Sequence, residues 1–259
     1  MLKIGLKLWS CNTGAYLREA ERLFAAGACS YVELFVVPDS SATLPDWRRL
    51  HDDEGVPFVI HNAHAAQGFN LADVSAAKRN REIYGETRRF ADALAAAHII
   101  FHGGVEGSIE ETARQLKALE EPRALLENKP AVPLPNALGV TTCRGATEAE
   151  IGYVLSETGC GFCLDVGHAI CAANLQGLEP YTYLQTLKRF RPTMFHLSDV
   201  ADMRSVYDAH PHLGTGQLDL ARLKRELFPV EAMISIETVK NSPDDLCDFE
   251  SDVRYLKNG

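Results

Sequence analysis

Short apolar runs alternate along the chain with longer stretches in which apolar residues recur every three or four positions. The runs have the length of buried strands, and stretches such as "AYLREAERLFAAG" have the periodicity of amphipathic helices. The eight runs are Ile4–Leu8, Tyr31–Val36, Phe58–Ile60, Ile99–Phe101, Ala124–Leu126, Gly161–Leu164, Met194–Leu197 and Met233–Ile236. The pattern therefore predicts a repeated unit of one strand followed by one helix.

Eight such units in 259 residues predict a closed (β/α)8 barrel, the TIM-barrel architecture, because a doubly wound open sheet usually needs fewer strands. We expect one domain over residues 1–259, since 46% hydrophobic residues can fill a large core and no Ser- or Gly-rich linker divides the chain. In this fold the carboxyl ends of all strands meet at one face, where active sites lie.

Composition limits the cellular location, the state of the thiols and the partners that we expect for the protein. The apolar runs are too short to span a bilayer, and "MLKIGLKLWS" predicts a strand rather than a signal peptide, so a cytoplasmic location is expected. Seven cysteines without paired spacing predict reduced thiols, and Cys160 and Cys163 are expected to pack in the core rather than to act in redox chemistry. The net charge of −9 gives no sign of the excess positive charge that is typical of nucleic-acid-binding proteins.

Ionisable residues follow strand after strand where each apolar run stops. They are His61 and His64, His102, Glu127, Asp165 and His168, His196 and Asp199, then Asp208, His210 and His212, and finally Glu237. One such residue alone would indicate only a hydrogen-bonded structural group. Burying this many at one rim is costly unless they are paired or coordinated, so the set predicts metal ions. Histidine and carboxylate without thiolate suit zinc, manganese or iron, and the number of ligands predicts more than one ion.

With these residues the chain resembles the endonuclease IV family (AP endonuclease family 2), within the xylose isomerase-like TIM barrel superfamily, from the first run to the last. The family's three-zinc site uses five histidines, two aspartates and two glutamates, and each has a counterpart here in order. The resemblance implies a first metal on His64, His102 and Glu127, a second on Glu127, Asp165, His196 and Glu237, and a third on His168, Asp208 and His210.

Such a cluster would polarise a phosphoryl group and lower the pKa of a bridging water, so the resemblance implies phosphoester hydrolysis. Glu127 and Glu237 would be the catalytic residues. Glu127 would bridge two ions, and Glu237 would orient the hydroxide or take its proton. His61 would orient His64 from behind.

The chain departs from the family in the loops that read DNA. The segment after the second run, "ELFVVPDSSATLPDW", has no early arginine, and Gln67 and Gly68 stand where the family carries an intercalating wedge. A small anionic or sugar-like substrate is therefore favoured, with abasic DNA as the alternative. The residues expected to contact it are Lys7, Glu33, Gln67, Lys129, His212 and Lys240.

Three functions remain open at this point. The first is a metal-dependent phosphoester hydrolase, and the second is a metal-dependent sugar or sugar-acid isomerase or epimerase, the branch that "GLKLWS" and "ENKP" resemble. The third, a non-catalytic binding barrel, leaves a full ligand set without a use. Isomerases of this superfamily generally use fewer ions, so His168, Asp208 and His210 together favour the hydrolase.

Overall fold

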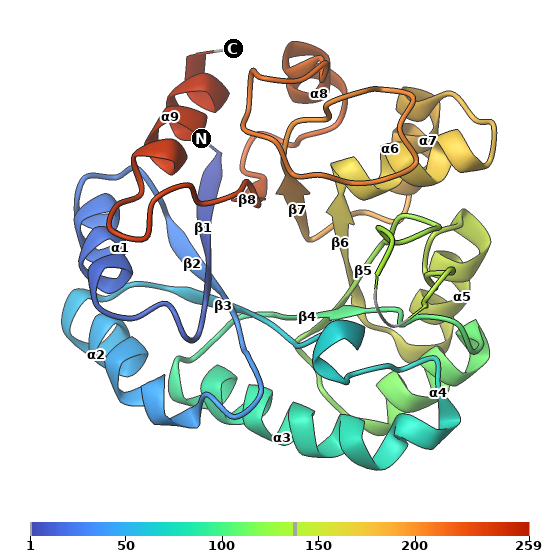
Figure 1. Cartoon of the computed structure of the whole chain (residues 1–259), viewed down its shortest axis with the longest axis horizontal. Helices are drawn as coiled ribbons and strands as arrows, with labels where there is room; N and C mark the ends of the chain where they lie inside the picture. Colours follow the sequence, from blue (N-terminus) through green and yellow to red (C-terminus); the bar gives the residue numbers. More distant parts are fainter. Residues whose placement is uncertain (1, 137–138, 259) are drawn as a thin grey trace.

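Eight parallel strands close into a barrel in the computed structural model, which describes residues 2–136 and 139–258. The strands are β1 (Lys3–Trp9), β2 (Tyr31–Phe35), β3 (Phe58–His61), β4 (Ile99–His102), β5 (Ala124–Glu127), β6 (Gly161–Asp165), β7 (Met194–Leu197) and β8 (Met233–Ile236). Each strand pairs with the next along the chain, and β8 pairs with β1 (Figure 1). The predicted (β/α)8 barrel is thus confirmed.

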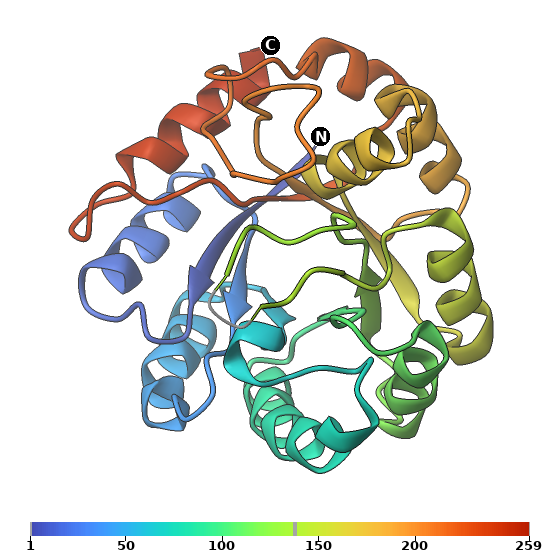
Figure 2. The same cartoon turned by 45° about the vertical axis from the view of Figure 1, so that its right-hand side comes forward.

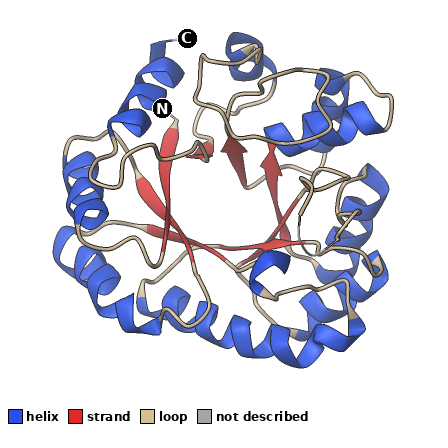
Figure 3. Ribbon diagram, viewed as in Figure 1, coloured by secondary structure: helices blue, strands red, loops and turns tan. Residues whose placement is uncertain are grey.

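Helices surround the barrel on the outside (Figure 3). They are α1 (Ala15–Ala25), α2 (Leu44–Glu54), α3 (Ala77–Ala93), α4 (Ile109–Ala118), α5 (Glu148–Thr158), α6 (Val166–Leu175), α7 (Pro180–Lys188), α8 (Leu220–Glu226) and α9 (Cys247–Asn258). Their apolar faces pack against the strands, with Trp47, Phe90 and Phe249 among the largest fully buried side chains. Within the described ranges, no helix has the length and apolar character needed to cross a membrane.

Apolar side chains fill the inside of the barrel in one layer. Its members are Tyr31, Val59, Ile100, Leu125, Cys163 and Met194, each from a different strand. At Gly5, which pairs with Tyr31 in β1 and β2, an added Cβ would lie 2.4 Å from the tyrosine ring, so only glycine leaves room for it. Cys163 is fully buried in this layer and all seven cysteines are free thiols, in agreement with the packing role predicted for it.

Long connections after the strands lie at the carboxyl end of the barrel. Figure 2 shows the connection between β5 and α5 reaching across the strands. Its residue Cys143 forms an antiparallel bridge with Val105, which follows β4. These connections form the walls around the residues at the strand ends.

Candidate metal centre

A polar layer lies directly above the apolar layer, because successive residues of a strand point to opposite faces and residues two apart share a face. The residue two positions after each member of the apolar layer is therefore also inside the barrel. These residues are Glu33, His61, His102, Glu127, Asp165 and His196, and Lys7 and Glu237 follow Gly5 and Ser235 in the same way. Strand register places His102 beside Glu127, and Asp165 beside His196.

The first group of candidate ligands is formed by His61, His102 and Glu127. Nε2 of His61 and Nε2 of His102 each lie 3.0 Å from Oε2 of Glu127. Nδ1 of His61 donates to the carbonyl of Asn62 at 2.8 Å, so its Nε2 carries the lone pair that a metal needs. The geometry thus groups His61 with His102 and Glu127, and the ligand role that the resemblance implies for His64 stays a prediction. The His64 ring stacks on His102 with centroids 5.2 Å apart, and burial and Lys129 lower its pKa to about 3.

The second group consists of Glu127, Asp165 and His196, with Glu237 beside them. Nδ1 of His196 lies 2.6 Å from Oε1 of Glu237, 3.5 Å from Oε2 of Glu127 and 3.9 Å from Oδ2 of Asp165. It is buried and, among the described residues, has no hydrogen-bond partner. A buried imidazole nitrogen faced by three carboxylates fits a divalent cation, which would satisfy all four groups.

The third group is His168, Asp208 and His210. Oδ2 of Asp208 lies 3.3 Å from Nε2 of His168 and 2.7 Å from Nε2 of His210. Nδ1 of His168 donates to the carbonyl of Asn128 at 2.9 Å, which leaves Nε2 to face a metal. This group also fits an ion, and the structure thus brings together every ligand named from the sequence except His64.

Asp165 and His168 are placed by the junction between β6 and α6. Asp165 is the last residue of β6 and the N-cap of α6, and its Oδ1 accepts a hydrogen bond from the backbone N–H of His168 at 2.6 Å. The N-cap bond fixes Asp165 and leaves its Oδ2 for the second group. The first turn of α6 then directs His168 to the third group.

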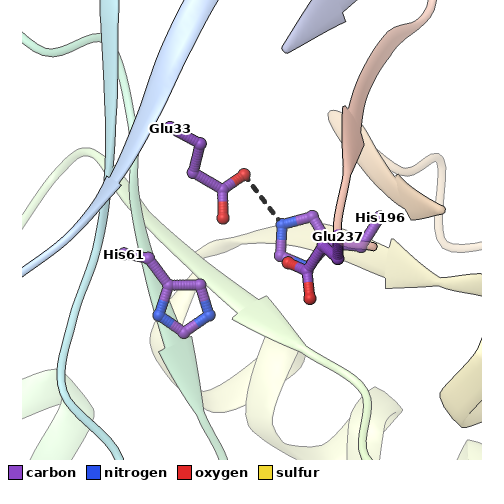
Figure 4. A group of neighbouring side chains, drawn as sticks. All are labelled: Glu33, His61, His196 and Glu237. Atoms are coloured by element: carbon purple, nitrogen blue, oxygen red, sulfur yellow. Dashed lines mark hydrogen bonds and ion pairs between the residues drawn. The ribbon is translucent and has the colours of Figure 1, made fainter. Parts of the chain in front are cut away.

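Glu33, His61, His196 and Glu237 form a fourth group of candidate ligands, and Lys7 lies beside it. Glu33 is fully buried, and its Oε2 accepts hydrogen bonds from Nε2 of His196 at 3.0 Å and from Oγ of Ser235 at 2.5 Å. Nζ of Lys7 lies 3.3 Å from Oε1 of Glu33 and donates to Glu237. Figure 4 shows the four side chains of this group, with a dashed line between Glu33 and His196.

The charges of this centre balance one another in an unusual way. Burial favours a neutral Lys7, but Glu237 and Glu33 raise its pKa well above the ordinary value, so it is an ammonium. Burial also favours a neutral Glu127, yet His102 and Lys129 hold the pKa of Glu127 well below its usual range. For Asp165, burial dominates and raises the pKa. Burial favours neutral imidazoles, yet the neighbouring anionic groups raise the pKa values of His168, His196 and His210. Without metal these protons compensate the carboxylates, and divalent ions would displace them.

A cavity of about 440 Å³ is lined by members of all three groups, His61, His102, Glu127, His168 and His210, and by Lys7, Lys129 and Lys240 on its charged side. Nζ of Lys129 lies 3.2 Å from Nε2 of His168. Within the described part of the chain, Gln67 and His212 line neither this cavity nor its neighbour. Instead, Nδ1 of His212 lies 2.9 Å from Oδ2 of Asp252 in α9, which ties the loop after β7 to that helix.

The fold and the donor set together define a (β/α)8 protein with a candidate multinuclear metal centre at the carboxyl ends of its strands. Residues 21–259 match the family described as xylose isomerase-like TIM barrel, and the chain belongs to that family.

Relatives of two kinds resemble the chain over nearly its whole length. Probable endonuclease 4 from Mycobacterium leprae (strain Br4923) is 28% identical over 256 residues, covering 94% of this chain and 97% of the relative. The structure of a D-tagatose 3-epimerase-like protein superposes with a TM-score of 0.71 at 18% identity, covering 98% of this chain and 96% of its own. Endonuclease IV from Thermus thermophilus superposes with a TM-score of 0.69 at 23% identity. The superposition covers 98% of this chain and 97% of the endonuclease chain. The two superpositions establish a shared fold alone.

Proposed function

We propose that the protein is a divalent-metal-dependent phosphoester hydrolase of the endonuclease IV type with three ions, zinc or alternatively manganese or iron. The observation that carries this proposal is the third group, His168, Asp208 and His210, which has its own donors apart from those of the first two groups. A reaction that needs one ion would leave these three residues without a use. The similarity to a probable endonuclease 4 supports the same reaction class.

In the hydrolysis, a water oxygen bonds to phosphorus while the ester P–O bond breaks, and the water protons end on the released alcohol and the phosphate. Divalent ions held by the three groups would polarise the phosphoryl oxygens and make the attacking water more acidic.

The residues of the chain position this reaction. Glu127 is suited to bridge two ions, because its Oε2 lies 3.0 Å from Nε2 of His61 and 3.5 Å from Nδ1 of His196. Burial favours a neutral Glu237, but His196 and Lys7 hold its pKa well below the usual range, so its carboxylate can orient the water by accepting a hydrogen bond. Lys129, beside His168, is placed to bind an anionic oxygen of the substrate.

Metal counting and turnover of a small phosphodiester test the proposal. Elemental analysis of the zinc-loaded protein should give three ions per chain, and His168→Ala should leave two while the fold persists. Glu127→Gln should abolish hydrolysis, because a neutral amide screens two neighbouring cations less well. Glu231→Gln, at an exposed position, is the control. One ion per chain in the wild type, or more than a tenth of its rate in Glu127→Gln, would contradict the three-ion site.

A metal-dependent sugar or sugar-acid isomerase or epimerase is the second candidate, and the contact of Lys7 with Glu237 favours it. An ammonium can stabilise negative charge on a substrate carbonyl oxygen while a carboxylate removes the proton from the neighbouring carbon. Incubation of ketoses with the metal-loaded protein in D2O distinguishes the two functions. Incorporation of deuterium at that carbon, without phosphoester hydrolysis, would establish the isomerase.

A further inference from the structure

A second cavity, of about 430 Å³, adjoins the candidate metal centre. It shares His64, His102, Lys129, His168 and His210 with the charged cavity and then extends to different segments of the chain. We call this extension the apolar lobe. Ala65, Ala66, Val105, Pro133, Leu134 and Val140 form most of its lining, and Asn136 and Asp208 are its polar members. The centre therefore lies between one pocket rich in lysine and one pocket with aliphatic walls.

The wall of the apolar lobe is built by two connections that are fastened to each other. The backbone N–H of Glu106 donates to the carbonyl of Thr142 at 2.9 Å, next to the bridge between Val105 and Cys143. Nε of Arg144 donates to the carbonyl of Glu106 at 2.6 Å. The two connections approach each other so closely that glycine is required at position 103, because a Cβ at Gly103 would lie 2.4 Å from the carbonyl oxygen of Arg144. These contacts fix the Val105 side of the lobe.

We propose that the apolar lobe binds an uncharged, aryl-sized or alkyl group of the substrate while the phosphoryl group lies at the metal centre. This inference rests on the proposed hydrolase function and names its substrate class: a phosphoester with an apolar group on one side. Its mainly aliphatic walls offer few hydrogen bonds, so a charged or strongly polar group would lose much of its hydration there without compensation. An apolar group instead gains from leaving water. The shared residues Lys129, His168 and His210 keep the two ends of such a ligand within one site.

The test compares two non-hydrolysable ligands, phenylphosphonate and methylphosphonate, by calorimetric titration into the zinc-loaded full chain. The two probes share the phosphonate group and differ in the apolar group alone. We expect phenylphosphonate to bind at least tenfold more tightly. Leu134→Asp and Val105→Asp should each remove this preference while methylphosphonate binding stays within about twofold, since neither residue belongs to the ligand groups.

Leu178→Asp is the matched control, because Leu178 is 46% exposed, comparable with the 56% of Leu134, and lines neither described cavity. It should retain the phenyl preference. Equal binding of the two phosphonates by the wild type would overturn the inference, as would a preference that survives both lobe variants or failure of either phosphonate to bind.

The experiment separates this inference from the proposed hydrolase function. A phenyl preference that depends on Leu134 and Val105, in a protein that hydrolyses no phosphoester, would support the lobe and reject the hydrolase. Equal hydrolysis of methyl and phenyl phosphodiesters with equal phosphonate affinities would support the hydrolase and reject the lobe.

Discussion

Nε2 of His196 donates a hydrogen bond to Oε2 of Glu33 across 3.0 Å, in a part of the barrel where neither side chain is exposed. Because a carboxylate can only accept, Nε2 of the ring keeps its proton, and Nδ1 faces Glu127, Asp165 and Glu237. Burial favours a neutral ring, yet its neighbours, Glu237 and Glu33 among them, raise the pKa of His196, so a divalent ion that binds at Nδ1 would displace a proton. Glu33 thus fixes the orientation of a candidate ligand from below rather than facing the cavity. This arrangement differs from the substrate contact that the sequence alone suggested for Glu33.

Glu33→Gln should weaken metal binding in the second group by roughly 10- to 100-fold, the usual cost of losing a partner that orients a metal ligand. The amide keeps the shape of the side chain but loses the charge that holds Nε2–H. Competition with a chromophoric chelator measures the affinity, and Glu54→Gln, at the exposed end of α2, is the control. Unchanged affinity in Glu33→Gln would mean that His196 needs no such partner.

His61 and His64 give opposite predictions. His61→Ala should remove one ion per chain, because its Nε2 is 3.0 Å from Oε2 of Glu127 and its Nδ1 is already hydrogen-bonded. His64→Ala should keep the full metal content. Elemental analysis of the two variants, prepared in parallel, measures the number of metal ions per chain. If His64→Ala loses metal and His61→Ala does not, then His64 is the ligand, as the family resemblance implies.

The alternation of residues in strands explains how much of this site could be read from the sequence. The strands themselves were predictable from their apolar runs, and most ligands follow directly at the strand ends. Tyr31 and Val59 of the apolar layer place Glu33 and His61, two residues later, inside the barrel. This periodicity was the available signal that His61 lies in the polar layer at the end of β3.

Contacts between distant segments could not be read from the sequence. His212 resembles its neighbours in "DAHPHLGTG", yet Asp252 in α9 holds it away from the cavity. The apolar lobe likewise depends on the bridge between Val105 and Cys143, which are far apart in the chain. Local pattern predicts which face a residue occupies, whereas these pairings follow from the packing of connections over the closed barrel.

Lys240 should make stability depend on pH in the alkaline range. Burial lowers the pKa of Lys240 to about 8 in the folded protein, against an ordinary value of 10.5. Between these values the unfolded chain binds more protons, so the contribution of Lys240 to the free energy of unfolding rises with pH. Below about pH 8 the cost of burying the ammonium is present in full.

Lys240→Met should therefore flatten the rise in stability between pH 8 and 10.5 relative to the wild type. Urea denaturation of the metal-free protein at several pH values measures the difference. Lys78→Met, at an exposed position of α3, is the control and should follow the wild type. Parallel pH profiles of Lys240→Met and the wild type would show that the folded protein does not perturb this lysine.

Duplex DNA should bind weakly, whether or not it contains an abasic site. The side chains of Lys7 and Lys129 are only 14% and 15% exposed, so they are recessed at the metal centre rather than presented to a phosphate backbone. The 35 acidic residues outnumber the 26 Lys and Arg residues, so the net charge of −9 opposes contact with phosphates and the dependence of affinity on salt should be shallow. Gln67, which occupies the position of the family's wedge, cannot offset the cost of unstacking a base.

Fluorescence anisotropy of labelled duplexes at about 150 mM salt tests this prediction, with and without an abasic analogue, alongside an assay for nicking. We expect equal and weak binding of both duplexes and no metal-dependent incision, while a small phosphodiester is hydrolysed by the same preparation. That comparison matters because a preparation without metal would fail on both substrates. Selective, tight binding of the abasic duplex with metal-dependent cleavage would instead contradict the small-substrate prediction and establish abasic DNA as the substrate.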